Sequence, residues 1–195
     1  MTPKRAAVIT YGCQMNKYES ERIAGILVGL GYEITSQTRG ADLILLNTCS
    51  IRDKAEQKVY SQLGQLKWLK RHNPDLIVGV CGCVAQQEGE HLLQRVPHVD
   101  LVFGPQNIPK LPALLTGVQT RRHQLSDLAD NPLWDEQLFP IHRDHPYQAW
   151  VTVMQGCDKF CTFCVVPYTR GREQSRPTAA IVDEVQALAD QGYKE

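Results

Sequence analysis

The sequence has no excess charge of either sign. Lys plus Arg and Asp plus Glu both number 21 in the 195 residues. A balanced charge gives no global electrostatic reason to expect a polyanionic partner, so any contact with nucleic acid must be local or lie elsewhere. Hydrophobic residues make up 43% of the chain, which is enough to bury one full core and part of a second.

Long apolar runs are also missing. The first residues, MTPKRAAVITYGC, lack the apolar core of a signal peptide, and no run approaches the ~20 apolar residues that a membrane span needs. We therefore expect a soluble, cytoplasmic protein with no membrane partner. Because thiols stay reduced in the cytoplasm, the seven cysteines are expected to bind metal or take part in catalysis rather than form disulfides.

Apolar runs alternate with helical patterns through the first half of the chain. Strands are expected at 5–11, 32–35, 43–46, 76–80 and 100–103, with helices between them. A last helix of this unit is expected at 108–115. This alternation predicts an α/β fold, an open and doubly wound parallel sheet of the flavodoxin or Rossmann kind, over residues 1–116.

The pattern changes after residue 116. Residues 117–147 lose their periodicity and contain Pro132, Pro140 and Pro146, which indicates a linker. Residues 148–195 are expected to form a strand, a cysteine-rich loop and a helix at 177–191. One such unit cannot bury its own apolar faces. It must either pack on the first domain or begin a longer domain of which this chain is a fragment, and we favour the fragment.

Cys157, Cys161 and Cys164 form a Cys-x3-Cys-x2-Cys pattern that one loop can wrap around an iron-sulfur cluster. Three ligands leave the fourth iron open to a small molecule. Ferredoxins supply four cysteines to each cluster, and structural zinc sites usually combine two spaced cysteine pairs. No second pair is near this loop. We therefore favour a cluster with an open iron over an electron carrier or a zinc site.

Cys13, Cys49 and Cys83 each follow an expected strand and precede an expected helix. The carboxyl ends of parallel strands meet at one edge of a sheet, where ligands bind, and helix N-termini at that edge favour anionic thiolates. Each cysteine taken alone could be an inert buried side chain. The three together predict a second three-thiolate cluster site. Cys81 lies two residues before Cys83, and geometry alone does not separate these two well.

Four segments together resemble the radical S-adenosylmethionine methylthiotransferases, most closely the tRNA-modifying branch of the MiaB type. They are residues 11–16, 47–52, 82–86 and 156–171. The resemblance implies that Cys83, and not Cys81, joins Cys13 and Cys49 in holding an auxiliary cluster.

The same resemblance implies that Cys157, Cys161 and Cys164 hold the radical-generating cluster, with Phe163 beside S-adenosylmethionine. Residues 148–195 would then be the first unit of a truncated radical domain, a partial barrel of the TIM type.

The resemblance also implies two [4Fe-4S] clusters and two uses of S-adenosylmethionine. One molecule donates a methyl group to sulfur, and another gives the radical that activates C2 of N6-isopentenyladenosine beside the anticodon of a tRNA. The implied partners are tRNA and a low-potential electron donor of the flavodoxin or ferredoxin type, and we expect a monomer. Most of the barrel and the RNA-binding β-domain are missing from these 195 residues, so this chain alone is expected to be inactive.

Related members of the family modify threonylcarbamoyladenosine in tRNA or an aspartate of a ribosomal protein. Residues 14–16 and 50–52 resemble the isopentenyladenosine branch. A non-enzymatic iron-sulfur or zinc module is the remaining alternative.

Basic residues follow the second cysteine loop and end one of the helices. Arg170, Arg172 and Arg176 could bind a phosphate or a cofactor carboxylate, or could form a solvated basic loop, and the sequence leaves both open. The segment 67–71 could touch RNA, but favourable cations at a helix C-terminus explain it more simply. The histidines show no metal-ligand spacing and are expected on the surface.

Overall fold

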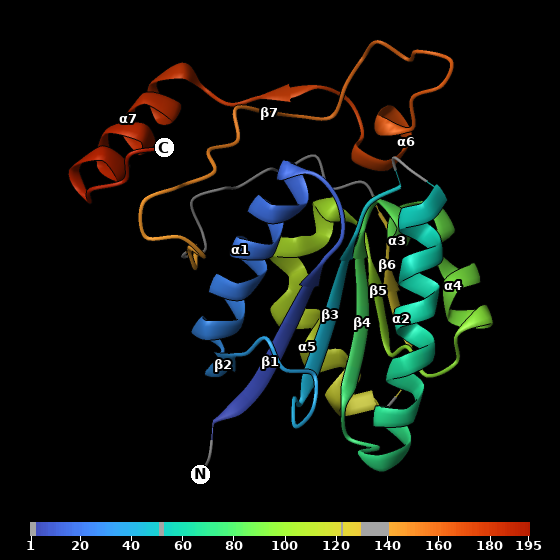
Figure 1. Cartoon of the computed structure of the whole chain (residues 1–195). Coiled ribbons are helices and arrows are strands. Elements are labelled where there is room, and N and C mark those ends of the chain that lie inside the picture. Colours follow the sequence, from blue (N-terminus) through green and yellow to red (C-terminus); the bar gives the residue numbers. More distant parts are fainter. Residues whose placement is uncertain (1–2, 51–52, 122, 130–140) are drawn as a thin grey trace.

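A parallel sheet covered by helices on both faces forms the larger part of the molecule (Figure 1). The computed structural model describes residues 3–50, 53–121, 123–129 and 141–195. The C-terminal residues form a second layer, which lies across the upper end of the sheet in the view of Figure 1.

Six parallel strands form the sheet, in the order β2-β1-β3-β4-β5-β6. The strands are β1 (Lys4–Thr10), β2 (Tyr32–Ile34), β3 (Leu43–Thr48), β4 (Ile77–Gly82), β5 (Leu101–Phe103) and β6 (Leu125–Asp127). The predicted α/β fold with an open parallel sheet is confirmed. The strand order reverses between β1 and β3, and crevices at such switch points are where sheets of this kind bind ligands.

Helices cover the two faces of the sheet, and each face has its own core. One core contains side chains of α1 (Gln14–Gly29), η1 (Pro105–Lys110) and α5 (Leu111–Arg121). The other contains side chains of α2 (Asp53–His72), α3 (Cys83–Glu88) and α4 (Glu90–Arg95).

The central strands are apolar because both of their faces are buried. Along β3, Leu43 and Leu45 belong to the α1 core, whereas Ile44 and Leu46 belong to the α2 core. The same alternation along β4 sends the fully buried side chain of Cys81 into the α1 core. Cys81 is therefore a core residue in this structure.

The sheet extends beyond residue 116, the boundary that the sequence predicts. Helix α5 continues to Arg121, and β6 then pairs with β5. This strand lies inside the segment that the sequence predicts as a linker. Its Leu-Ser-Asp sequence is half-buried at the edge of the sheet, so it lacks the apolar run that marks the central strands. Residues 130–140 of the predicted linker, with Pro132 and Pro140, lie outside the described residues.

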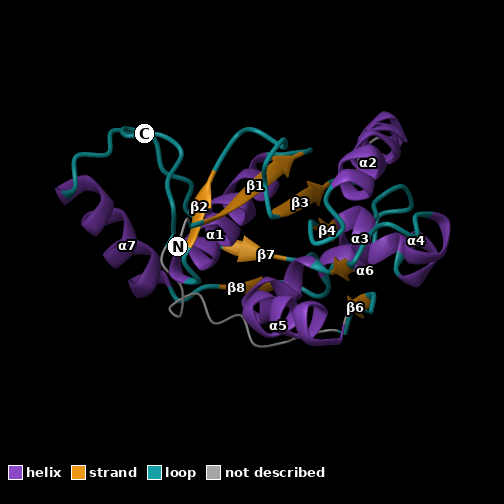
Figure 2. Cartoon of the chain, turned by 90° about the horizontal axis from the view of Figure 1, so that it is seen from below, coloured by secondary structure: helices purple, strands orange, loops and turns teal. Residues whose placement is uncertain are grey.

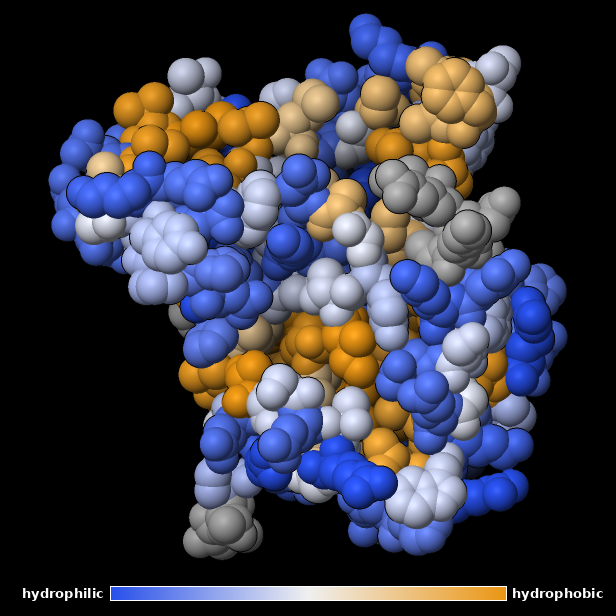
Figure 3. Space-filling model, viewed as in Figure 1, coloured by the Kyte–Doolittle hydropathy of each residue, from blue (hydrophilic) through white to orange (hydrophobic). Residues whose placement is uncertain are grey.

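The C-terminal layer contains little regular structure. The two-residue strand β7 (Met154–Gln155) pairs antiparallel with β8 (Gln174–Ser175), between which lies α6 (Val166–Arg170). Helix α7 (Thr178–Asp190) follows, as the sequence predicts, but none of its residues is buried. Figure 2 shows α7 standing away from the sheet, and Figure 3 shows apolar surface over it. The strand that the sequence predicts before the second cysteine loop is limited to the two residues of β7, and the partial barrel stays a prediction.

None of the helices in the described ranges combines the length and the apolar composition that crossing a membrane requires.

Gly82 joins β4 to α3 in a conformation that only glycine adopts easily. Its φ is +89°, and a Cβ there would lie 2.3 Å from the carbonyl oxygen of Thr48. We expect Gly82→Ala to lower the free energy of unfolding by about 2 to 3 kcal/mol, because it adds both backbone strain and a clash. Urea unfolding measures this. Gly64→Ala is the control, since a Cβ at Gly64 meets nothing within 4 Å. Equal losses in the two variants would contradict this explanation.

Candidate functional site

Cys13, Cys49 and Cys83 lie at the carboxyl edge of the sheet, as the sequence predicts. Cys13 precedes α1, Cys49 follows β3, and Cys83 is the first residue of α3. The ends of β1 and β3 approach so closely that a Cβ on Gly12 would lie 2.5 Å from the Cβ of Cys49. Cys49 and Cys83 are buried and Cys13 is half-buried. The structure therefore brings together three cysteines that are far apart in the sequence.

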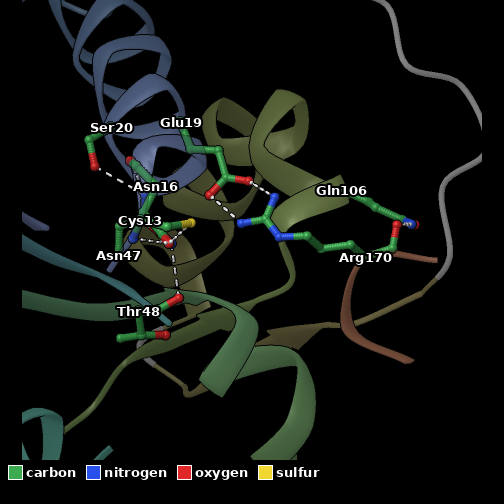
Figure 4. A network of polar contacts seen from close by, with 8 residues as sticks. All are labelled: Cys13, Asn16, Glu19, Ser20, Asn47, Thr48, Gln106 and Arg170. Atoms are coloured by element: carbon green, nitrogen blue, oxygen red, sulfur yellow. Dashed lines mark hydrogen bonds and ion pairs between the residues drawn. The ribbon is translucent and has the colours of Figure 1, made fainter. Parts of the chain in front are cut away.

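Two fully buried asparagines, Asn16 and Asn47, join the segments that carry Cys13 and Cys49. Figure 4 shows both asparagines beside Cys13. The side-chain amide of Asn16 donates to Asn47 Oδ1 and to the carbonyl of Thr48, both at 3.0 Å. The amide of Asn47 donates in return to the carbonyl of Asn16 at 2.9 Å. This exchange joins the start of α1 to the end of β3. The signal for it in the sequence is a polar Asn-Thr pair that ends an otherwise apolar strand.

The thiols of Cys13 and Cys83 differ in pKa. A hydrogen bond from Cys49 lowers the pKa of Cys13 to about 5, and the backbone N–H groups of Asn16 and Met15 act in the same direction against burial. Burial raises the pKa of Cys83, although the Arg170 guanidinium opposes it. Cys13 is therefore a thiolate at neutral pH. A metal that binds all three sulfurs would displace the remaining protons.

Arg170 lies against these cysteines, and this position was not predicted. Its guanidinium forms two bonds to Glu19, at 2.6 and 3.3 Å, and both side chains are at most 7% exposed (Figure 4). The sequence left two roles open for Arg170, binding of a substrate phosphate and a place in a solvated loop. The structure supports neither, because the charge of Arg170 is already paired inside the protein. Burial disfavours that charge, but Glu19 and the thiols of Cys83 and Cys13 outweigh burial and raise the pKa of Arg170.

The other two arginines behave differently. Arg172 is 72% exposed and pairs with Asp158 at 3.4 Å, as in a solvated basic loop. Arg176 is largely buried and pairs with Glu184 at 2.6 Å.

Charged residues far from the cysteines also have structural partners. Lys70, in the basic segment at the end of α2, pairs with Asp100 at 2.7 Å and so links α2 to the start of β5. His98 is half-buried and contacts the carbonyl oxygen of Leu63 at 2.7 Å, so the prediction that all histidines are surface residues is wrong for His98.

Cys157, Cys161 and Cys164 lie together in the loop between β7 and α6. Cys161 is exposed and the other two are half-buried. The N–H of Cys157 donates to the carbonyl of Gly171 at 3.1 Å, and the N–H of Cys164 donates to the carbonyl of Cys161 at 3.0 Å. The Phe163 side chain is 92% exposed. This loop therefore presents the Cys161 thiol and the ring of Phe163 to solvent.

The two groups of thiols differ from a site for a single metal ion. In the described ranges, no three His, Cys, Asp or Glu side chains lie close enough together to hold one ion. A four-iron cluster binds each thiolate through a different iron, so its ligands stand farther apart than those around one ion. Thiolates are the ligands that iron-sulfur clusters use, and both groups supply them. The donor chemistry fits a cluster, and the assignment of ligands remains a prediction.

The pH dependence of alkylation tests the charge of Cys13. In metal-free, reduced protein, its alkylation by iodoacetamide should rise around pH 5 and then level off, because only the thiolate reacts. A cysteine in an unfolded peptide should instead follow the ordinary pKa of 9.0. Cys49→Ala removes the hydrogen bond and should move the midpoint upward. If the alkylation of Cys13 and that of the peptide cysteine had the same pH midpoint, the proposed thiolate at Cys13 would be contradicted.

The same shift makes folding stability depend on pH. The pKa of Cys13 is lower in the folded chain than its ordinary value of 9.0. Its contribution to stability is therefore complete above that value and is lost as the pH falls through about 5.

The fold and the edge cysteines define the class of protein to which the chain belongs. The family model described as "Uncharacterized protein family UPF0004" matches residues 5–104, just over half of the chain. The matched region runs from β1 to the residue after β5 and includes Cys13, Cys49 and Cys83. The chain belongs to this family.

Curated relatives carry the name "tRNA-2-methylthio-N(6)-dimethylallyladenosine synthase". The relative from Yersinia enterocolitica is 50% identical over 193 residues and that from Halalkalibacterium halodurans 47% over 194, each covering 98% of this chain. The relative from Carboxydothermus hydrogenoformans is 45% identical over 197 residues and covers the whole chain. The chain spans 36 to 45% of the length of these three relatives.

Proposed function

We propose that the chain is the N-terminal part of a radical S-adenosylmethionine methylthiotransferase. The whole protein would add a methylthio group to C2 of N6-isopentenyladenosine beside the anticodon of a tRNA and give 2-methylthio-N6-isopentenyladenosine. One observation carries this proposal: two separate groups of three cysteines, one at the carboxyl edge of the sheet and one in a single loop, lie in a chain about half identical to relatives of that name.

Each group of cysteines has its own task in this proposal. Cys13, Cys49 and Cys83 hold the auxiliary [4Fe-4S] cluster, and Cys157, Cys161 and Cys164 hold the one that meets S-adenosylmethionine. When bound, the clusters supply sulfur at the first group and the electron for cofactor cleavage at the second. The burial of Cys49 and Cys83 supports a site from which water is excluded.

The exposed loop supports binding of a small molecule at the second group. The ring of Phe163 is open to solvent, where it can lie against bound S-adenosylmethionine. Residues 148–195 then begin the radical barrel, whose further strands would cover the exposed apolar side chains of α7, Val182 and Val185. An electron donor of the flavodoxin or ferredoxin type, a monomeric state and a cytoplasmic location belong to the same proposal.

Nucleoside analysis of tRNA tests this function. Cells that lack the gene for the protein should accumulate N6-isopentenyladenosine and lose its 2-methylthio derivative, and the restored gene should return it. Genes with alanine at either group of cysteines should fail to restore it. Persistence of the methylthio group in the deletion strain would overturn the proposed substrate and favour threonylcarbamoyladenosine or a ribosomal aspartate.

A further inference from the structure

Two buried ion pairs join α1 to the C-terminal layer. Glu19 pairs with Arg170 at 2.6 Å, and Glu21 pairs with Arg143 at 3.0 Å. All four side chains are at most 11% exposed. The Glu21–Arg143 pair continues to Glu184 of α7, at 3.4 Å from Arg143. Only the Glu19–Arg170 pair lies beside cysteines.

The main chain around Arg170 also holds the second cysteine loop. The carbonyl of Gly171 accepts the N–H of Cys157 at 3.1 Å. The carbonyl of Arg170 itself accepts the side-chain amide of Gln106, on η1, at 3.0 Å. The contact with Gly171 is close, because a Cβ on Gly156 would lie 2.6 Å from the Gly171 carbonyl oxygen. The backbone next to Arg170 is thus bonded both to the loop of Cys157 and to the sheet domain.

The side chain of Arg170 faces the first cysteine group. Its charge acts on Cys83 and Cys13, and Thr169, one residue earlier, hydrogen-bonds to Cys83. Arg170 therefore lies between the two groups. Its guanidinium reaches the surroundings of the first group, and the next residue, Gly171, bonds to the loop of the second.

The Glu19–Arg170 pair does more than attach the C-terminal layer to α1. An apolar pair of similar volume would hold two layers together at least as well, because removing two charges from water has a large desolvation cost. Arginine can bind one carboxylate with two parallel bonds and still turn positive charge toward other anions. Three thiolates and a bound cluster would bring negative charge to this buried edge of the sheet. Pairing with Glu19 alone does not explain why the guanidinium of Arg170 lies beside the cysteines, whereas balancing that negative charge does.

We propose that Arg170 is a positioning residue that Glu19 holds in place, so that it fixes the second cysteine loop over the first cysteine group and supplies positive charge to the ligands there. This rests on the proposed function. It concerns two residues to which neither the family match nor the names of the relatives assign any role.

The reduction potential of the first cluster tests the role of the charge. The chain with alanine at 157, 161 and 164 would be reconstituted with iron and sulfide and titrated anaerobically. Arg170→Gln should make the potential more negative, because it removes a cation that stabilises the reduced, more negative cluster. Glu19→Gln should move it in the opposite direction. Glu21→Gln, a matched buried carboxylate away from the cysteines, should leave it unchanged.

Hydrogen exchange of the metal-free chain tests the role in positioning. Arg170→Gln and Glu19→Gln should increase the exchange rate of the Cys157 N–H at least about tenfold, because the loop loses its attachment. Glu21→Gln should leave that amide as it is in the parent chain. Arg170→Lys keeps the charge but not the two-bond geometry, so it should restore most of the potential while exchange stays fast.

The outcomes separate this inference from the function on which it rests. If the parent chain loads no cluster on Cys13, Cys49 and Cys83, the proposed function fails, and exchange at Cys157 still decides whether Arg170 positions the loop. If the cluster loads but its potential is the same in the Arg170→Gln, Glu19→Gln and Glu21→Gln chains, the inference is overturned. If the Arg170→Gln chain does not fold, the reduction potentials and the Cys157 exchange rates of the Glu19→Gln and Arg170→Lys chains test the inference.

Discussion

Replacing Cys157, Cys161 and Cys164 with alanine should remove half of the iron that the chain binds after anaerobic reconstitution. The parent is expected to hold about eight iron atoms per chain and the variant about four, because each group of cysteines carries one four-iron cluster. Iron and acid-labile sulfide are measured together, so that adventitious iron without sulfide is recognised. The substitutions leave Cys13, Cys49 and Cys83 unchanged, so the first site should stay intact.

The complementary variant, with alanine at Cys13, Cys49 and Cys83, should lose the other half. Cys81→Ala is the matched control, because Cys81 is a neighbouring buried cysteine whose side chain lies in the α1 core. It should retain both clusters. Loss of a cluster in the Cys81→Ala chain, with retention in a Cys83→Ala chain, would show that Cys83 had been assigned wrongly as the third ligand.

Asn47→Ala should lower the free energy of unfolding by about 3 kcal/mol and should also impair loading of the first site. The substitution removes two donated hydrogen bonds, to the Asn16 carbonyl and to Ser20 Oγ, and leaves the buried amide of Asn16 without its Asn47 acceptor. Urea unfolding of the metal-free chain measures the first effect, and iron content measures the second.

Asn107→Ala provides the comparison for this variant. Asn107 is also fully buried, and its amide donates to the carbonyls of Asp127 and Ala129 at 2.9 and 3.1 Å, away from the cysteines. It should lose comparable stability and keep its iron. If both asparagine variants bound iron equally well at equal stability, Asn47 would have no special role in shaping the site.

The sheet could be predicted because its signals are local. Each central strand is a run of apolar residues buried on both faces, as in Leu43–Thr48 and Ile77–Gly82. Parallel strands place their carboxyl ends at one edge, so the cysteines after β1, β3 and β4 had to gather there. The strand order itself, with its reversal between β1 and β3, has no local signal.

The parts that could not be predicted depend on pairs of residues far apart in the sequence. Glu19 and Arg170 are 151 positions apart, and nothing in a basic loop shows which carboxylate one of its arginines will meet. Asn16 and Asn47 are 31 positions apart and each could be read as a local helix or strand end. At the edge of the sheet, the strand Leu125–Asp127 is too short and too polar to produce a pattern.

Mössbauer spectroscopy of the reconstituted parent chain, recorded with and without S-adenosylmethionine, tests the central claim most directly. If each group of three thiols binds its own cubane with one uncapped iron, the spectrum should show only four-iron clusters, with about eight irons per chain, and the added molecule should change the signal of a single iron. Four irons or fewer, or a spectrum that the added molecule leaves unchanged, would contradict it.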